Sequence, residues 1–320
     1  MFLAARCLRR QRREIPLWLK HQTVLGNAMK YFHSSNKIDP DSFKSVAYDV
    51  KDEVAHIQLN RPHVLNAIDM HMPGEIQDAV KLANWDENVK VLVLSGKDGV
   101  FCSGYDLKIF AEPERGTTPF SQTMPWDPYL DFSLMSECTF AFMSLWRSLK
   151  PVVCKIEKYA IAGGSDIALC CDNIFMADDA VIGYPPARVW GCPTTAMWVY
   201  RIGLEKAKYM LFTGDLINGV EAEKIGLVGK SVQADKLDDT VNNFVDRIKS
   251  VPTNQLFFQK QVINQAVEQM GLFASQRLAS VFDGMTRHSP EGAAFQERTN
   301  QVGFKQAVKE RDMGTRKWKK

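Results

Sequence analysis

Two short glycine-containing loops hold the residues whose types and spacing could carry chemistry. The first runs from Phe101 to Leu107 (FCSGYDL), and the second runs from Ala160 to Asp166 (AIAGGSD). Glycine allows positive φ or close approach of a ligand to the backbone, and an N–H at a helix start carries the positive end of the helix dipole. Two such N–H groups directed at one point would stabilise an enolate oxygen, an effect worth roughly a hundred- to a thousandfold in rate per donor.

Each loop also has a purely structural interpretation, because a strand followed by glycine and a helix is a common turn. Asp166 has two interpretations as well. An acid in the first helical turn can cap backbone donors and complement the helix dipole, or it can transfer protons in an active site. The local sequence leaves both open.

Metal and redox chemistry find little support in the sequence. The chain has seven cysteines without a CxxC pair, and the adjacent Cys170 and Cys171 stand in an apolar run that is typical of core filling. The six histidines show no metal-ligand spacing. The sequence therefore predicts neither a zinc site nor an iron site.

Strands that alternate with helices must position the two loops. A β-hairpin is expected over 46–58, a helix over 70–82, and buried strands over 89–94 and 152–156, each ahead of one loop. This alternation predicts an α/β fold. Further strands are expected at 174–177 and 181–182, and further helices at 132–149, 167–171, 194–202, 206–213, 221–224 and 237–249.

The rest of the chain contributes a loop and a helical end. Residues 110–131 are rich in Pro, Gly, Ser and Thr, and so long a loop is more typical of a binding loop or lid than of a connector. After Pro252 the pattern is helical throughout, over 254–269, 272–287 and 292–309.

The charge is unevenly distributed along the chain. Residues 1–38 hold eight basic residues and one acidic residue, so this segment carries a net charge of +7. Because the whole chain carries +3, the remainder carries −4. Such a segment resembles a mitochondrial transit peptide and predicts a matrix location; the alternative is a basic arm that is never removed. The mildly acidic body gives no reason to expect nucleic acid as a partner, and no apolar run is long enough for a membrane span.

Seven segments together resemble the crotonase superfamily of enoyl-CoA hydratases and isomerases, in their order and spacing. The resemblance covers residues 46–296, and the segments are 60–67 (NRPHVLNA), 101–107, 150–153 (KPVV), 162–169 (AGGSDIAL), Cys171-Asp172, Thr213-Gly214 and Glu221-Ala222. The resemblance implies a ββα spiral core over 39–250 and a helical C-terminal region over 251–320 that builds homotrimers or homohexamers. It also implies an acyl-CoA substrate, whose coenzyme A is part of the substrate rather than a separate cofactor.

The resemblance further implies a role for individual residues. The two oxyanion donors match the backbone N–H groups of Tyr105 and Gly163, and the first loop adds cofactor contacts at Ser103, Asp106 and Leu107. The turn after Asn60 resembles the family's CoA-contacting turn. Further CoA contacts are expected at His63, Val64 and Leu65, and, from a neighbouring subunit's C-terminal region around Phe295, at Phe304 and Lys305.

The acidic residues depart from the family pattern. Its hydratases use two glutamates; the first position matches Asp166 and the second falls on Pro186, which cannot move a proton. The additional acids of dienoyl-CoA isomerases match Pro186 and Thr194. Nearby Tyr184 is interpreted as an aromatic residue of the core or pocket, and Arg188 as a surface residue or a phosphate contact.

The resulting expectation is a hydratase-like lyase of fatty acid metabolism, with Tyr105, Gly163 and Asp166 as its catalytic groups. Decarboxylation or hydrolysis of an acyl-CoA remains an alternative, because these reactions place fewer demands on the second acid. A second alternative is a decayed crotonase that serves as a structural or interaction subunit in mitochondria. That alternative predicts collapsed loops and no open channel to Asp166.

Overall fold

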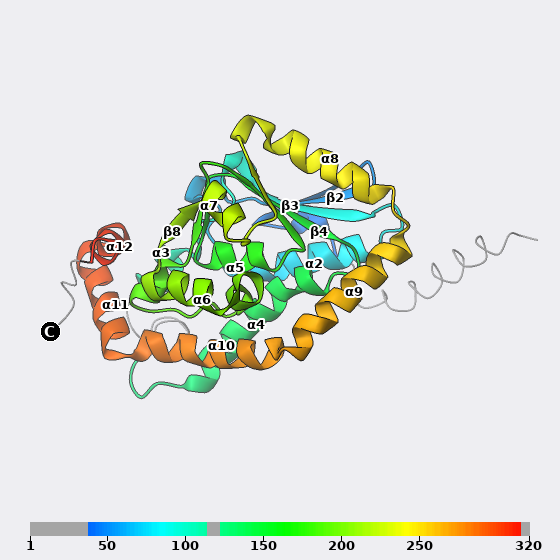
Figure 1. The fold of residues 1–320 in the computed structure, drawn as a ribbon. Helices are drawn as coiled ribbons and strands as arrows, with labels where there is room; N and C mark the ends of the chain where they lie inside the picture. The colour runs from blue at the N-terminus through cyan, green and yellow to red at the C-terminus, as the bar shows by residue number, and fades with distance from the viewer. Residues whose placement is uncertain (1–37, 114–121, 315–320) are drawn as a thin grey trace, which may run out of the picture. The chain divides into compact units, whose positions relative to one another are not determined.

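A six-stranded sheet forms the centre of the computed structural model, which describes residues 38–113 and 122–314 (Figure 1). Its first two strands are the predicted antiparallel hairpin, and each later strand is parallel to its neighbour. The strands, in their order across the sheet, are β1 (Val46–Lys51), β2 (Val54–Leu59), β3 (Val91–Gly96), β4 (Val152–Ile156), β6 (Asn173–Ala177) and β9 (Lys230–Val232).

A second, three-stranded sheet holds the segment ahead of the second loop. It consists of β5 (Tyr159–Ile161), β7 (Val181–Gly183) and β8 (Leu216–Asn218); β5 is parallel to β7, and β8 is antiparallel to β7. Strands β5, β8 and β9 were not expected, because three residues are too few to show an alternating pattern.

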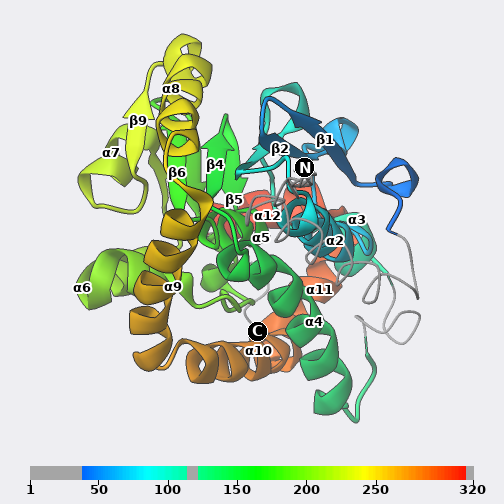
Figure 2. The ribbon, with the colours of Figure 1, turned by 90° about the vertical axis from the view of Figure 1, so that its right-hand side faces the viewer.

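Helices cover the sheets, and the α/β fold class predicted from the sequence is confirmed (Figure 2). Those within the sheet-forming part are α2 (Met72–Trp85), α3 (Leu107–Phe110), α4 (Pro128–Arg147), α5 (Gly163–Leu169), α6 (Met197–Thr213), α7 (Gly219–Lys224) and α8 (Leu237–Lys249). The later ones are α9 (Thr253–Gln269), α10 (Leu272–His288), α11 (Pro290–Val302) and α12 (Phe304–Asp312).

Glycine explains two differences from the expected helices. The helices expected at 194–202 and 206–213 are one element, α6, with a kink at Gly203, where φ is +75°. The single helical stretch expected over 292–309 is interrupted at Gly303, where φ is +78°, so that α11 and α12 are separate helices. A helical periodicity continues through such a residue in the sequence even when the backbone changes direction.

The segments with the most continuous apolar sequence lie in the core. All six residues of β3 are buried, as the continuous apolar run predicted, and Cys170 and Cys171 are fully buried, which confirms that they fill the core. At the turn after β2, the buried Asn66 side chain accepts a hydrogen bond from the Arg61 N–H and donates to the carbonyls of Lys97 and Val100. This turn is thereby fixed to the chain that enters the first loop.

Helix α4 connects the sheet-forming part to the C-terminal helices, because it packs against both α2 and α10. Its first residue is Pro128, and the Asp127 carboxylate accepts a hydrogen bond from the Tyr129 N–H at 3.0 Å as its N-terminal cap. The expected loop over 110–131 therefore ends earlier than predicted, and its residues 114–121 lie outside the described residues. The predicted transit peptide also lies outside them, apart from Ile38.

Candidate active site

The two glycine loops predicted from the sequence lie side by side. Cys102 of the first loop and Ala160 of the second are partners in a parallel β-bridge. The Cys102 N–H donates to the Tyr159 carbonyl at 2.7 Å, and the Ile161 N–H donates to the Cys102 carbonyl at 3.0 Å. Main-chain hydrogen bonds therefore fix the position of one loop relative to the other.

Glycine is required where the loops approach each other. A Cβ on Gly164 would lie 2.5 Å from the carbonyl oxygen of Cys102. Gly104 has a φ of +97°, and a Cβ at that position would lie 3.0 Å from the Ile161 carbonyl and 3.7 Å from the Gly163 nitrogen. Any side chain at either position would force the two backbones apart.

This packing leaves the backbone N–H groups of Tyr105 and Gly163, one on each loop, without a main-chain partner among the described residues. The Ile68 N–H donates to the Gly104 carbonyl at 2.8 Å, and the Ile68 carbonyl accepts from the Asp106 N–H at 2.9 Å. Tyr105 stands between these two bonds, and Gly163 is the first residue of α5. Within residues 38–113 and 122–314, no carbonyl accepts a hydrogen bond from the N–H of Tyr105 or of Gly163. Two such donors are the components of an anion-stabilising site.

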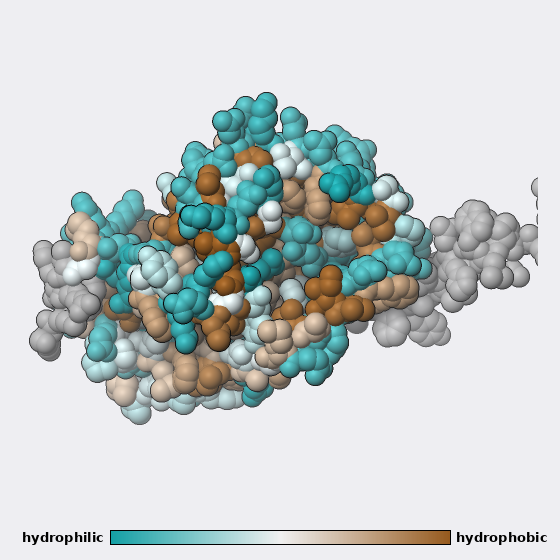
Figure 3. All heavy atoms as spheres, in the orientation of Figure 1, coloured by the Kyte–Doolittle hydropathy of each residue, from teal (hydrophilic) through white to brown (hydrophobic). Residues whose placement is uncertain are grey.

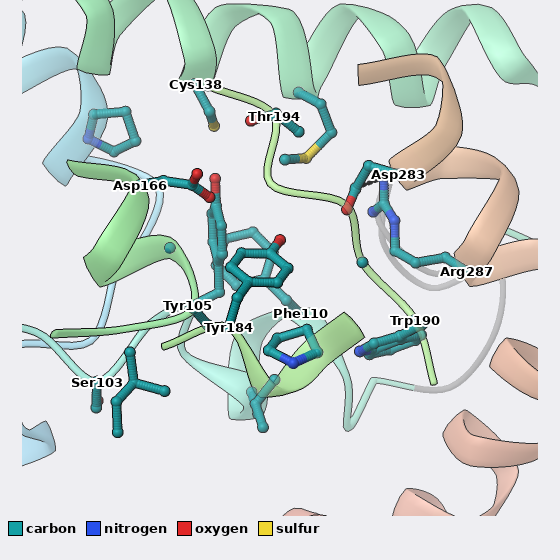
Figure 4. A pocket seen from close by; sticks show the side chains of 18 of the residues that line it. Ser103, Tyr105, Phe110, Cys138, Asp166, Tyr184, Trp190, Thr194, Asp283 and Arg287 are labelled. Carbon is teal, nitrogen blue, oxygen red and sulfur yellow. Dashed lines mark ion pairs between the residues drawn. The ribbon is translucent and has the colours of Figure 1, made fainter. Parts of the chain in front are cut away.

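Both residues line one cavity of about 500 Å³ (Figure 4). Its lining is mainly apolar, with a small number of polar groups, as is typical of small-molecule sites. Five of the residues proposed from the sequence line it, namely Asp166, Tyr105, Gly163, Ser103 and Leu107. Other lining residues come from α4, from the chain after β7 and from the C-terminal helices, and include Met135, Cys138, Tyr184, Pro186, Trp190, Asp283, Arg287, Phe295, Val308 and Arg311.

The remaining residues proposed from the sequence lie elsewhere. Among the described residues, the cavity lining does not include His63, Val64, Leu65, Asp106, Phe304 or Lys305. The first three belong to the turn that Asn66 fixes, and Leu65 there has a φ of +55°. Asp106 accepts a hydrogen bond from the Lys108 N–H as the cap of α3 and pairs with Arg61 at 3.0 Å.

Asp166 lies in the cavity wall and does not cap its helix. The N-terminal cap of α5 is Ala162, and no side chain accepts a hydrogen bond in that role. The Asp166 carboxyl instead accepts a hydrogen bond from the Thr195 hydroxyl at 2.7 Å. Burial raises the pKa of Asp166 to about 8, although the Thr195 bond opposes this shift. Burial therefore favours the protonated form of the carboxyl. Because no side chain caps α5, the capping interpretation is wrong.

Sequence analysis missed a charged pair on α10 that lines the opposite side of the cavity. Asp283 accepts a hydrogen bond from the Cys192 N–H at 3.1 Å, and its other oxygen lies 3.1 Å from Nη2 of Arg287. The same nitrogen lies 3.2 Å from the Asp131 carboxylate of α4. Burial raises the pKa of Asp283, and the Arg287 guanidinium opposes the shift.

A helical pattern could have revealed this pair. The buried positions of α10 follow one stripe at Leu272, Gln276, Ala279, Ser280, Asp283 and Gly284. An aspartate on the buried stripe of a helix, with an arginine four residues later, indicates an ion pair turned toward the interior. The pattern predicts the pair but not the cavity that it faces.

Pro186 lies in the cavity wall at the position predicted for a second acid, inside the 3₁₀ turn Pro185–Arg188. Tyr184, directly before that turn, is a buried residue of the wall, as expected, and burial raises its pKa well above the usual range. Arg188 donates to the Thr213 carbonyl and pairs with Asp215 and Asp312, so it joins the turn to α12.

Comparison with known proteins identifies the family. The family model described as enoyl-CoA hydratase/isomerase matches residues 49–306. The chain belongs to the enoyl-CoA hydratase/isomerase family. It is 31% identical over 221 residues to a probable mitochondrial enoyl-CoA hydratase of Dictyostelium discoideum, covering 68% of this chain and 74% of the relative. It is 28% identical to the crotonyl-CoA hydratase of Syntrophomonas wolfei, over 71% of this chain and 84% of the relative.

Solved structures of the family show the same fold. An enoyl-CoA hydratase from Mycobacterium smegmatis matches with a TM-score of 0.81 and 40% identity, over 87% of this chain and 96% of that one. A family member from Xanthobacter autotrophicus matches with a TM-score of 0.77 and 27% identity, over 85% and 99%. The crotonase resemblance inferred from the loops is therefore confirmed.

Within the described residues, no group of three or more His, Cys, Asp or Glu side chains is arranged to hold a metal ion. None of the described helices combines the length and the apolar character that a bilayer crossing requires.

Proposed function

We propose that this family member binds acyl-CoA thioesters and acts as a hydratase-type lyase on an enoyl-CoA. The observation that carries the proposal is the meeting of three groups on one cavity: the N–H groups of Tyr105 and Gly163, which have no main-chain partner among the described residues, and the buried carboxyl of Asp166 with its raised pKa. Relatives named enoyl-CoA hydratase and crotonyl-CoA hydratase support the same class of substrate.

The proposed mechanism assigns a different task to each group. The two N–H groups bind the thioester oxygen and stabilise the negative charge that develops on it when water adds to the double bond. Asp166 follows Gly163 by three residues in α5, so it lies beside the thioester end and donates its proton to the α-carbon. The raised pKa of Asp166 suits this task, because the acid form is the one required.

Calorimetry with crotonyl-CoA and acetyl-CoA tests the proposal most directly. Both should bind, and the crotonyl-CoA mixture should lose its conjugated enoyl-thioester absorbance over time. The absence of detectable binding by either thioester would overturn the proposal and favour the decayed structural subunit. That alternative is weakened by the open cavity of about 500 Å³ that reaches Asp166.

An acyl-CoA decarboxylase or hydrolase is the second candidate, and Pro186 favours it because proline offers no proton carrier where a second acid was expected. The assay distinguishes these activities by their products. Hydration adds the mass of one water to the thioester, decarboxylation removes carbon dioxide, and hydrolysis releases free coenzyme A thiol.

The coenzyme A moiety is assigned to the residues around the first loop. We propose contacts from His63, Val64 and Leu65 in the exposed turn and from Ser103, Asp106 and Leu107 beside the cavity mouth. The C-terminal region of a neighbouring subunit would contribute Phe304 and Lys305. Substituting Lys305 with alanine should weaken binding of acetyl-CoA more than binding of a thioester that carries pantetheine alone.

We also propose that the chain forms a homotrimer or homohexamer through its C-terminal helices. Large apolar side chains are exposed along α9 and α10, where Figure 3 shows apolar surface, and an exposed patch of this kind marks an interaction site. Its members include Phe258, Val262, Ile263, Met270 and Phe273. Light scattering of the purified chain gives the mass that decides between the two assemblies and a monomer.

The mitochondrial matrix is the proposed location. The Arg-rich segment over 1–38 and the relative named mitochondrial support it. A fusion of residues 1–38 to a reporter protein should direct that reporter to mitochondria, and a diffuse reporter would contradict the proposal.

A further inference from the structure

Two carboxyl groups enter the cavity from opposite sides, and only one of them was expected. Figure 4 shows Asp166 on one side and Asp283 on the other, with the Tyr184 side chain between them. Both aspartates line the cavity, and both are buried. A pair of carboxyl groups on one substrate cavity is the arrangement that general acid–base catalysis uses.

The Asp283 carboxylate lies next to the turn where the second acid was expected. The three heavy atoms nearest to a Cβ on Gly191 would be the Pro186 Cβ at 2.9 Å, the Tyr184 hydroxyl oxygen at 3.5 Å and Oδ1 of Asp283 at 3.8 Å. These three groups therefore surround a single point of the cavity wall. Helix α10 therefore places the Asp283 carboxylate beside Pro186, the position at which a second acid was expected.

The surroundings of the two carboxyl groups differ in kind. Asp166 accepts a hydrogen bond from a neutral hydroxyl, whereas Asp283 accepts one from the Cys192 N–H and is paired with a guanidinium. A cation favours the ionised form of its neighbour, so Asp283 is the better proton acceptor and Asp166 the better proton donor. The two environments divide the acid and base tasks between the two residues.

We propose that Asp283 is a second catalytic residue of this site and acts as the general base that activates water. The inference rests on the proposed hydratase function. The Asp283 carboxylate takes one proton from water while the water oxygen forms its bond to the β-carbon. The π electrons of the double bond move to the α-carbon, which takes the proton of Asp166.

The product then carries both parts of the water molecule. Asp283 is left protonated and Asp166 ionised, and proton exchange through solvent returns one proton from Asp283 to Asp166. No oxidant, metal or additional reactant takes part. The thioester oxygen remains bound at the N–H groups of Tyr105 and Gly163 throughout.

The alternative role for Asp283 is purely structural, since it could serve only to hold Arg287. Asp131 provides a matched control, because it pairs with the same guanidinium nitrogen at a similar distance but does not line the cavity. Its other oxygen accepts a hydrogen bond from the Trp126 indole. Asp283→Asn and Asp131→Asn each leave Arg287 with one carboxylate.

The test measures kcat, KM and thioester affinity for the wild type and both variants with crotonyl-CoA. Asp283→Asn should lower kcat about a hundredfold or more with thioester affinity within about threefold, since general base help is worth roughly a hundred- to ten-thousandfold. Asp131→Asn should lower kcat less than about tenfold. Equal losses in the two variants would mean that Asp283 only holds Arg287, and they would overturn the inference.

The dependence of kcat/KM on pH gives a second test, because a purely structural role of Asp283 would leave that dependence unchanged. The wild-type kcat/KM should fall on the acid side as Asp283 is protonated, and Asp283→Asn should lack that limb. Asp131→Asn should retain it. The charged or titratable groups facing Asp283 are Arg287, Asp131, Asp166, Tyr105, Cys138, Tyr184 and Cys192.

The outcomes separate this inference from the proposed function. A wild-type protein that binds and hydrates crotonyl-CoA, with Asp283→Asn equally active, would overturn the inference and leave the function intact. A wild-type protein that binds no acyl-CoA would overturn the function itself. If Asp283→Asn does not fold, Asp283→Glu gives the same test by moving the carboxylate by one methylene, and an unchanged kcat would overturn the inference.

Discussion

The two sides of the cavity are built in different ways. One side, here named the loop wall, consists of Ser103–Tyr105 and Ala162–Asp166 and presents backbone N–H groups. The other side, named the α10 wall, presents the side chains of Asp283 and Arg287. Main-chain bonds and glycine fix the loop wall, whereas a helix packed on α4 and an ion pair with Asp131 fix the α10 wall.

In the proposed mechanism, the loop wall binds the thioester and the side-chain acids select the reaction. Backbone donors stabilise the same developing negative charge whatever side chain stands beside them, so the loop wall would suit many reactions of one kind of substrate. The side chains on the α10 wall and Asp166 would then decide which protons move. Changes to side-chain acids should therefore alter kcat, and changes to the loop backbone should alter the whole site.

The largest expected effect is that of Asp166→Asn. The amide keeps the size of the side chain and its bond to Thr195 but has no proton to donate at neutral pH. Hydration of crotonyl-CoA should slow about a thousandfold, within the range known for general acid–base catalysis. Thioester affinity measured by calorimetry should change little. An unaffected rate would mean that another group donates the proton.

A methyl group on Gly164 should disturb the loop wall next most strongly. The new Cβ would lie 2.5 Å from the Cys102 carbonyl, so the loops must separate and one N–H donor must leave its place. We expect a loss of about a hundredfold in kcat/KM, comparable to the loss of one oxyanion donor.

The matched control for this prediction is Gly229→Ala. A Cβ on Gly229 meets only the Ile174 carbonyl, at 3.4 Å, and the residue does not line the cavity. Its kcat/KM should stay within about twofold of the wild type. Similar losses in both variants would show that glycine matters for stability and not for the loop wall.

The raised pKa of Asp166 predicts a smaller, pH-dependent effect on stability. Between the usual carboxyl pKa of 3.8 and the folded value of about 8, the folded chain binds one more proton than the unfolded chain. The stabilisation that this proton gives is complete below pH 3.8 and is lost as the pH rises toward 8.

Asp166→Asn should remove this dependence. The free energy of unfolding of the variant minus that of the wild type should increase from pH 5 to pH 8, by at least about 1.4 kcal/mol, the equivalent of one pKa unit. Denaturant unfolding at both pH values measures it. A difference that stays constant with pH would contradict the protonated state assigned to Asp166.

Removal of residues 1–38 should have the smallest effect. Their concentrated charge and scattered apolar residues give them little to contribute to a core. The melting temperature and kcat should be unchanged, while import into isolated mitochondria should stop. A cooperative loss of stability would show that the segment belongs to the folded body.

The loop wall could be predicted because its requirements are local. Gly104 needs positive φ, Gly164 needs close packing, and Asp166 follows Gly163 by one helical turn, so the sequence contains all three signals within a few residues. The buried strand β3 and the amphipathic α8 were predictable for the same reason, since each shows a complete periodic pattern.

The position of the α10 wall in the cavity could not be predicted, because it depends on contacts between residues far apart in the sequence. Asp283 reaches the cavity because α10 packs across α4 and because the Cys192 N–H, far earlier in the chain, fixes its carboxylate. Strands β5, β8 and β9 escaped prediction because their pairing partners, rather than their own residues, define them. The CoA contacts around Leu65 and Lys305 stay predictions.

Because α12 lies beyond the break at Gly303, near the end of the sequence, the ribosome makes this part of the cavity lining late. The cavity lining extends from Asp69 to Asp312, and its last members, Val308, Arg311 and Asp312, stand on α12. A nascent chain that has formed both sheets still lacks one part of this lining until α12 leaves the exit tunnel. Acyl-CoA cannot assist the folding of the earlier parts through its complete site, because contacts so distant in sequence form late. The substrate meets its full site only after α12 has been made.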